Sequence, residues 1–312
     1  MLANKKLEGK PDLDARTFQQ KLDELTVTLA FKVQREGYQQ GLRPAFLVAD
    51  LYFLLRQAQQ TYNLFFFVNA DKRRYEDPDW RPAYLAVMLP LVRTMIDCLY
   101  NVTTILQNPG PNGNLFRMSG YRLVLESLDS DAARYGGDPK WDEWIARQRK
   151  SIEFDMRANG FTESQVRAEK KLWPTLSRYL RVDKNTAPTP HQEFLRKLTF
   201  GFWQEYSGIS HATFQGLMPI AIFLAPKDLP HDDRPKVENA SEELMAIHIP
   251  RVALILVCML TELQAHLRFN GAHINQRLRE IWDALIIAPE VKELYDARYA
   301  QLIKDRGLNG DF

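Results

Sequence analysis

The chain has 312 residues and a mass of 36.3 kDa, and 45% of its residues are hydrophobic and 26% are charged. This composition is ordinary for a soluble protein with a packed core, arranged as one large domain or two modest ones. With 41 Lys and Arg against 39 Asp and Glu, the formal net charge is only +2, which excludes a bulk nucleic-acid coat protein and a basic membrane-surface protein.

Hydrophobic residues recur at helical spacing through the first third of the chain. The stretch from 84 to 106 is the most hydrophobic, with Pro90 as a kink site near its start. The run from Gln107 to Asn114, rich in Asn, Pro and Gly, is the strongest loop signal. The expected elements are a helix capped by Asp14 and running through residue 29, a helix over 43–67, a charged loop over 69–82, a helix over 84–106 and a loop over 107–114.

Residues 115–185 form a mildly basic segment, which we expect to be a helical insert. A helix over 141–156 is expected to stop at 159–160, and Thr162 and Gln165 have the spacing of a capping box. That box predicts a second helix, continuing through Leu180. Residues 140–184 contain 11 basic and 7 acidic residues, which indicates either a solvated face or a surface that guides RNA.

The last third returns to core-like sequence. The expected elements are helices over 191–211, 217–224, 249–269, 278–287 and 291–303, a loop over 226–235, a helix cap at Asn239 and a break at Gly271. No alternating strand pattern is present, so the predicted fold is an all-α multi-helix bundle. We expect a single domain over 1–312, with a core from residues 14–106 and 191–303.

The cysteines and the apolar segments bear on location. Cys98 and Cys258 each lie inside an apolar run, which rules out a disulfide scaffold and predicts a reducing cytoplasm. Residues 252–260 are very apolar, but Arg251 and Glu262 bracket them closely, so a buried core helix is favoured over a membrane span. We therefore expect no membrane partner and leave a homodimer open.

One narrow charged stripe marks the most hydrophobic helix. Arg93 and Asp97 are the only charged residues between 82 and 106, and Asn101 follows four residues later. Steps of four residues advance only about 40° around a helix, so the three share a face. The stripe either lines a polar pocket, or it is a wet edge or internal ion pair with no role in binding.

A second polar pattern lies near residue 207. Ser207 and His211 are four residues apart on one helical face, beside Tyr206. A hydroxyl next to an imidazole suggests nucleophile activation, but no carboxylate is placed to orient the histidine. The pattern therefore indicates one wall of a polar pocket, with a hydrogen-bonded core histidine as the alternative.

A third pattern follows the long apolar helix near the C-terminus. Glu262, His266 and His273 are residue types that bind metals. The Glu-x-x-His pair of di-iron bundles is missing, so we expect no metal and no cofactor.

The same stretch resembles the signature of HEPN-type helical ribonucleases. Arg268 and His273 have the Arg-x4-His spacing of that signature, and the resemblance implies that they act on an RNA phosphate. In such chemistry the histidine moves a proton while the arginine stabilises phosphoryl charge. Five residues of unbroken helix place the two side chains about 140° apart, so the interpretation requires a kink at Gly271.

A broader resemblance covers about residues 40–225. Arg93-Thr-Met-Ile-Asp97 and Tyr206-Ser207-Gly-Ile-Ser-His211 look like the two motifs of an uncharacterised bacterial all-helical family, R-[ST]-x-x-[DE] and [YL]-S-x-x-x-H, some of whose members are distantly HEPN-like. The resemblance implies that Arg93, Asp97, Ser207 and His211 face each other across the bundle.

These observations predict a protein that binds a phosphate-bearing ligand such as RNA or a nucleotide, with cleavage of that ligand as an open further step. Arg93 would contact the phosphate, Asp97 would orient Arg93 or His211, and His211 would be the general acid or base. Asn101, Tyr206, Arg268 and His273 are candidate ligand contacts. The alternative is a non-catalytic scaffold whose polar centre only sets helix register.

Overall fold

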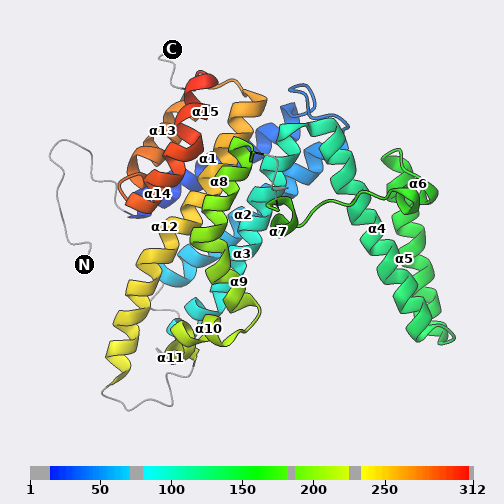
Figure 1. Cartoon of the computed structure of the whole chain (residues 1–312), viewed down its shortest axis with the longest axis horizontal. Helices are drawn as coiled ribbons and strands as arrows, with labels where there is room; N and C mark the ends of the chain where they lie inside the picture. The colour runs from blue at the N-terminus through cyan, green and yellow to red at the C-terminus, as the bar shows by residue number, and fades with distance from the viewer. Residues whose placement is uncertain (1–14, 71–79, 182–186, 225–232, 309–312) are drawn as a thin grey trace.

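The fold was obtained as a computed structural model, which describes residues 15–70, 80–181, 187–224 and 233–308. In these residues all regular structure is helical, which confirms the all-α prediction. The expected cap at Asp14 and most of the expected loops over 69–82 and 226–235 lie outside the described residues. Figure 1 shows a bundle of long helices from which a two-helix arm projects.

Two long helices form the centre of the bundle. Helix α3 (Trp80–Gln107) runs through Pro90 without interruption and packs against α12 (Arg234–Leu267) and α2 (Phe46–Ala70), and α1 (Ala15–Glu36) covers α2 and α12. Residues 252–260 of α12 are fully buried, because apolar side chains surround this part of the helix and need cover on every side. Helices α3 and α12 are long and apolar enough to cross a membrane, but 61% and 67% of their most apolar windows are buried in the bundle. They pack as core helices.

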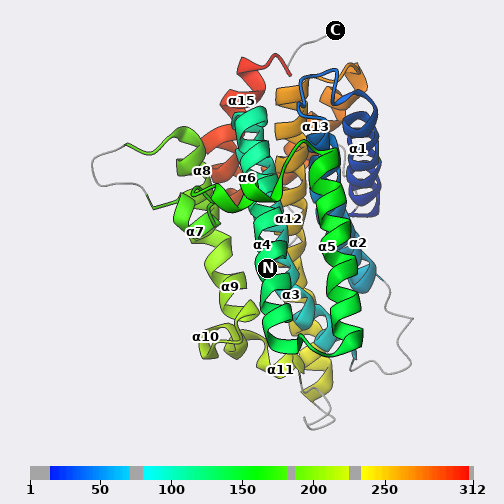
Figure 2. The same cartoon turned by 90° about the vertical axis from the view of Figure 1, so that its right-hand side faces the viewer.

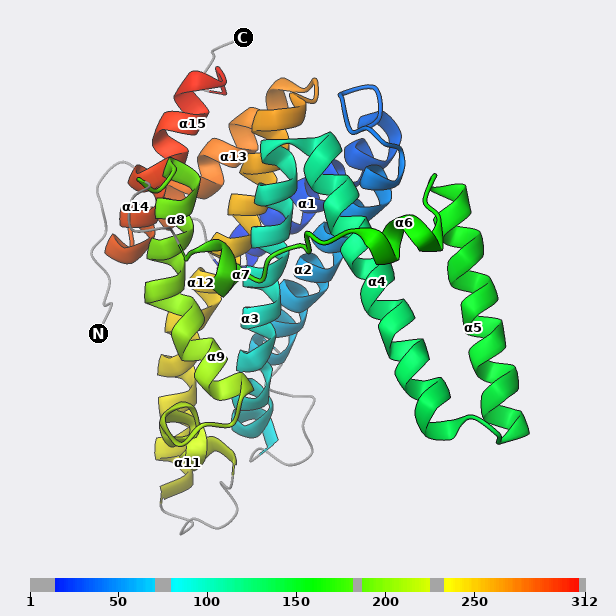
Figure 3. The same cartoon turned by 45° about the vertical axis from the view of Figure 1, so that its right-hand side comes forward.

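The arm begins where we expected a loop. Helix α4 (Pro109–Tyr135) starts directly after Asn108 and antiparallel α5 (Pro139–Ala158) follows it, as Figures 2 and 3 show. The expected loop over 107–114 is therefore wrong. Proline is tolerated in the first turn of a helix, where an N–H has no partner in any case, so Pro109 and Pro111 start this helix instead of preventing it. At the base of the arm, Arg117 pairs with Asp50 of α2 at 2.7 Å.

The chain returns from the arm to the bundle through two short helices. The capping box of Thr162 and Gln165 is confirmed and opens α6 (Glu163–Ala168), but the helix ends there and does not continue to Leu180. Only α7 (Leu176–Tyr179) follows. The break begins at Glu169, whose ψ of 116° is extended, and Pro174 prolongs it, because a proline disfavours helical geometry in the residue before it.

The C-terminal third supplies the helices around the candidate site. Two expectations change here: the cap at Asn239 is wrong, because α12 already begins at Arg234, and the expected helix over 191–211 is divided by a π-helical turn. The break at Gly271 is confirmed. In order, the elements are α8 (Pro190–Leu198), the π-helix Thr199–Trp203, α9 (Gln204–Ser210), α10 (Phe214–Leu217), the 3-10 turn Met218–Ile220, α11 (Ala221–Leu224), α12, α13 (Ala272–Leu285), α14 (Pro289–Leu294), the π-helix Tyr295–Tyr299 and α15 (Ala300–Asp305).

Candidate functional site

Arg93 and His211 meet between α3 and α9. The Arg93 Nη1 atom lies 2.8 Å from His211 Nε2, across 118 residues of sequence. A guanidinium group has only donors, so Nε2 must accept this hydrogen bond. His211 is therefore neutral in this contact and carries its proton on Nδ1. The His211 side chain is exposed at the C-terminal end of α9, so the contact lies where solvent can reach it.

Trp203 completes this contact, a role that the sequence pattern near Ser207 did not predict. The Arg93 guanidinium lies over the Trp203 ring, 5.4 Å from its centroid, within the range of a cation–π interaction. Trp203 is four residues before Ser207 and eight before His211, so the three lie along one side of the α9 segment. This four-residue spacing was the sequence signal that could have placed Trp203 at the site.

Two hydrogen-bond donors of this stacked pair have no partner. The Arg93 Nε and Trp203 Nε1 atoms are both buried, and neither meets a hydrogen-bond acceptor in the described structure. About nine in ten buried polar groups in proteins have a partner, and an exception calls for an explanation such as a missing ligand or water. The pair therefore offers two unused N–H groups beside a positive charge, which suits an anionic acceptor.

The local backbone at this site is unusual. Trp203 ends the π-helix Thr199–Trp203, which joins α8 to α9. A π-helical turn widens the helix and changes which side chains face a neighbour, and such turns are frequent at functional sites. Here the turn lies immediately before the face that carries Ser207 and His211.

Asp97 and Ser207 are close in sequence to this contact but do not join it by hydrogen bonds. Burial raises the pKa of the Asp97 carboxyl, and the charge of Arg93 opposes this shift. Asp97 forms no ion pair with Arg93, whose guanidinium is turned to His211. Ser207 is buried, and among the described contacts its hydroxyl makes no hydrogen bond to the His211 ring. The geometry thus lacks an assembled nucleophile–base pair.

Asn101 and Tyr206 are engaged elsewhere. The Asn101 Oδ1 atom accepts a 2.9 Å hydrogen bond from Trp173 Nε1, which anchors the segment between α6 and α7 on α3. The Tyr206 hydroxyl lies 2.7 Å from His248 Nδ1 inside the bundle. The predicted stripe on α3 therefore divides, with Arg93 facing α9 and Asn101 holding the return from the arm.

The residues near Gly271 form a separate region. Arg268 ends α12 with a left-handed φ of 52°, and His273 lies just inside α13, so both are exposed on either side of the predicted break. No described contact joins them to each other or to Arg93. Glu262 is fully buried and holds Arg298 by two bonds, with Oε2 3.0 Å from Nη2. Among the described residues, no three potential ligands gather around a metal position.

The basic arm is partly neutralised by its own carboxylates. Arg149 and Arg167 share Asp129, and Arg147 lies beside Glu143. These pairs favour the solvated-face interpretation of the basic segment.

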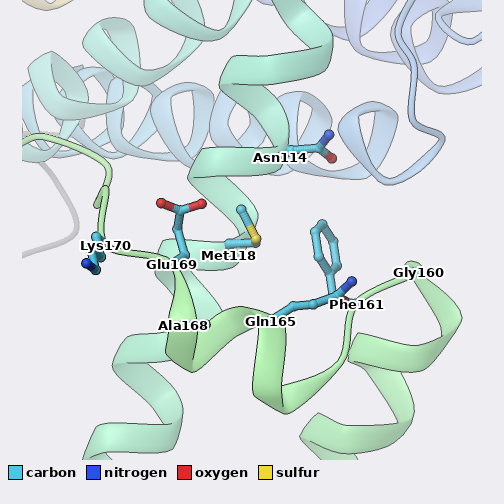
Figure 4. A pocket seen from close by; sticks show the side chains of 8 residues that line it. All are labelled: Asn114, Met118, Gly160, Phe161, Gln165, Ala168, Glu169 and Lys170. Atoms are coloured by element: carbon cyan, nitrogen blue, oxygen red, sulfur yellow. The ribbon is translucent and has the colours of Figure 1, made fainter.

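A hollow of about 670 Å³ lies between α4 and α6. Figure 4 shows Met118 of α4 and Phe161 beside each other at this hollow. The Glu169 backbone carbonyl and carboxylate there accept hydrogen bonds from Arg122 and the Lys171 backbone. This hollow is built from the arm and its return, and it does not include Arg93 or His211.

Comparison with protein-family models, curated proteins and solved structures finds no match to this chain. The geometry of the site is therefore the basis on which a function is proposed.

Proposed function

We propose that the protein binds a phosphate-bearing ligand, such as RNA or a nucleotide, at the contact of Arg93, Trp203 and His211. The observation that carries this proposal is the pair of buried, unpartnered donors, Arg93 Nε and Trp203 Nε1, beside a guanidinium at the surface. Phosphate oxygens accept several such bonds at once, and bonds between charged groups are about twice as strong as neutral ones.

Cleavage of the ligand is the further step of this proposal. A phosphate oxygen that binds Arg93 Nη1 would displace His211 Nε2 and free the lone pair of that nitrogen. His211 is then a general base, and Arg93 stabilises the charge that develops on the phosphoryl group. The HEPN-type resemblance implies the same division of roles for Arg268 and His273, and that resemblance stays a prediction. A cytoplasmic location without a membrane partner belongs to the same proposal.

The binding test compares two arginines of similar exposure. Arg93→Gln removes the proposed phosphate contact, whereas Arg277→Gln removes an arginine that pairs with Glu24 on another face. We expect Arg93→Gln to weaken binding of adenosine 5′-monophosphate and of a short single-stranded RNA by about tenfold to a hundredfold, the worth of a charged hydrogen bond. Arg277→Gln should leave both affinities unchanged. Equal affinities for all three proteins, or no binding by the unaltered chain, would overturn the proposal.

If RNA is the ligand, the arm could extend the site. Lys150, Lys170 and Lys171 form no ion pair with a described residue, whereas Arg147 and Arg149 do. Neutralising all five together should weaken RNA binding and reduce its dependence on salt, because fewer counterions are then released. Unchanged RNA affinity after that substitution would restrict the ligand to the Arg93 contact.

The second candidate is a scaffold in which this contact only sets helix register. It is favoured by the use of Asn101 and Tyr206 in internal hydrogen bonds and by the way Arg93 joins α3 to α9. Under this alternative, Arg93→Gln and His211→Gln lower the denaturant midpoint but no phosphate compound binds. Under the proposal, both variants stay close to the unaltered chain in stability and lose binding.

A further inference from the structure

A second pocket lies on the α12 side of α9, with a volume of about 190 Å³. Leu89 of α3 forms part of its wall, and α9, α10, the 3-10 turn and α12 surround it. The pocket depends on Gly216, because a Cβ atom there would lie 2.2 Å from the backbone of Gly208. This close approach of α10 to α9 holds the wall in place.

A buried histidine presents one nitrogen to this pocket. His248 is 1% exposed and lines the pocket, and its Nδ1 atom lies 2.7 Å from the Tyr206 hydroxyl. Among the described contacts, Nδ1 is the only acceptor that meets this buried hydroxyl, and a buried O–H donor needs an acceptor, so its proton points to His248. Nδ1 therefore accepts, and the remaining proton of the neutral ring is on Nε2. Burial lowers the pKa of His248 to about 4, which keeps the ring neutral near pH 7.

Glu205 stands opposite this nitrogen but does not bond it directly. Its Oε1 atom is 3.9 Å from His248 Nε2, beyond hydrogen-bond range, while Oε2 bonds Arg251 at 2.9 Å. A ligand oxygen at about 2.8 Å from both Oε1 and Nε2 could bridge these two atoms by hydrogen bonds. It would have to accept a hydrogen bond from Nε2–H and donate one to the carboxylate. A hydroxyl group does both, whereas an ether or a carbonyl only accepts.

We propose that this pocket binds a small molecule with several hydroxyl groups, of the size of a pentose, through a hydroxyl held between His248 and Glu205. Gln204 and Gln215 also line the pocket, whose remaining wall is largely apolar, and an amide side chain offers both donors and acceptors to further hydroxyls. The volume is below the roughly 300 Å³ of a site for a drug-sized ligand, which limits the occupant to a small molecule. This site is independent of the phosphate contact at Arg93.

Two carboxylates provide a matched test, since Glu205 and Glu290 both pair with Arg251 but only Glu205 lines the pocket. D-ribose is the probe, and tetrahydrofuran, the ring of its furanose form without hydroxyls, is the control compound. Binding is measured by saturation-transfer NMR with the full-length chain and with Glu205→Gln and Glu290→Gln. Glutamine has one acceptor oxygen and an NH2 donor in place of two acceptor oxygens, so it cannot accept hydrogen bonds from Arg251 and from the ligand hydroxyl with separate oxygens. We therefore expect Glu205→Gln to weaken ribose binding by about tenfold or more. Glu290→Gln should change it by less than about twofold.

A third variant tests the pocket independently of whether Glu205→Gln still folds. Leu244→Trp enlarges a partly exposed side chain of the pocket wall without touching the polar groups, and it should also abolish ribose binding. The proposal is overturned if tetrahydrofuran binds as well as ribose, if ribose does not bind the unaltered chain, or if the Glu205 and Glu290 variants behave alike. It is also overturned if the filled pocket still takes ribose.

Discussion

Replacement of Arg298 by methionine is expected to destabilise the bundle core, because it removes one partner of a buried ion pair. Glu262 on α12 is fully buried, and both of its carboxylate oxygens bond Arg298, which is itself 11% exposed. Arg298→Met keeps the volume near that of arginine but leaves the buried carboxylate without its guanidinium partner and with the His266 Nδ1 atom 3.7 Å from Oε2. Breaking a buried pair from one side costs about 3–5 kcal/mol, a large share of the roughly 5–15 kcal/mol that holds a typical protein folded.

The double variant Glu262→Met/Arg298→Met separates the charge from the packing. Because it removes both ions and restores an apolar contact, it should recover most of the lost stability. The measurement is urea unfolding followed by far-ultraviolet circular dichroism, with the midpoint and slope of each protein compared. A loss below about 1 kcal/mol in Arg298→Met, or a double variant as unstable as the single one, would refute this account of Glu262.

Two further predictions concern a buried histidine and two glycines. His191 is buried between Thr103 and Tyr179, and its pKa falls from 6.5 to about 3. As the pH falls below about 6.5, His191 therefore takes up a proton in the unfolded chain before it does so in the native chain. Between about pH 6.5 and about pH 3, the free energy of unfolding falls by up to about 1.4 kcal/mol per pH unit. The advantage of the unaltered chain over His191→Gln should shrink from about pH 7 to about pH 5 in denaturant titrations, and a constant difference would contradict this. Gly216→Ala should unfold at lower urea concentration, since its Cβ atom would meet the Gly208 backbone. Gly120 is exposed in α4 with open space around it, so Gly120→Ala should raise the free energy of unfolding by about 0.5–1 kcal/mol. Equal midpoints for these two variants would show that the α9–α10 contact tolerates a side chain.

The sequence patterns were informative where structure is local. The periodicity predicted the all-α class and the central helix over 84–106, and the capping box of Thr162 and Gln165 forms as expected. Each of these depends on residues within a few positions of one another. The loop predicted over 107–114 was wrong for a related reason, because Pro109 and Pro111 suit a loop and the first turn of a helix equally well.

The partners of the polar residues were decided by the tertiary structure. Arg93 and Asp97 have the spacing of an ion pair, yet Arg93 bonds His211 and lies over Trp203, both more than 100 positions away. Asn101 shares their face but bonds Trp173, because the chain returning from the arm crosses α3 at that turn. A helical pattern determines which face a side chain occupies, whereas packing against other helices determines what that face meets. For this protein, helical periodicity therefore determined the bundle class by itself, and only the docking of α9 and α12 beside α3 produced the contact of Arg93 with His211 and the pocket at His248.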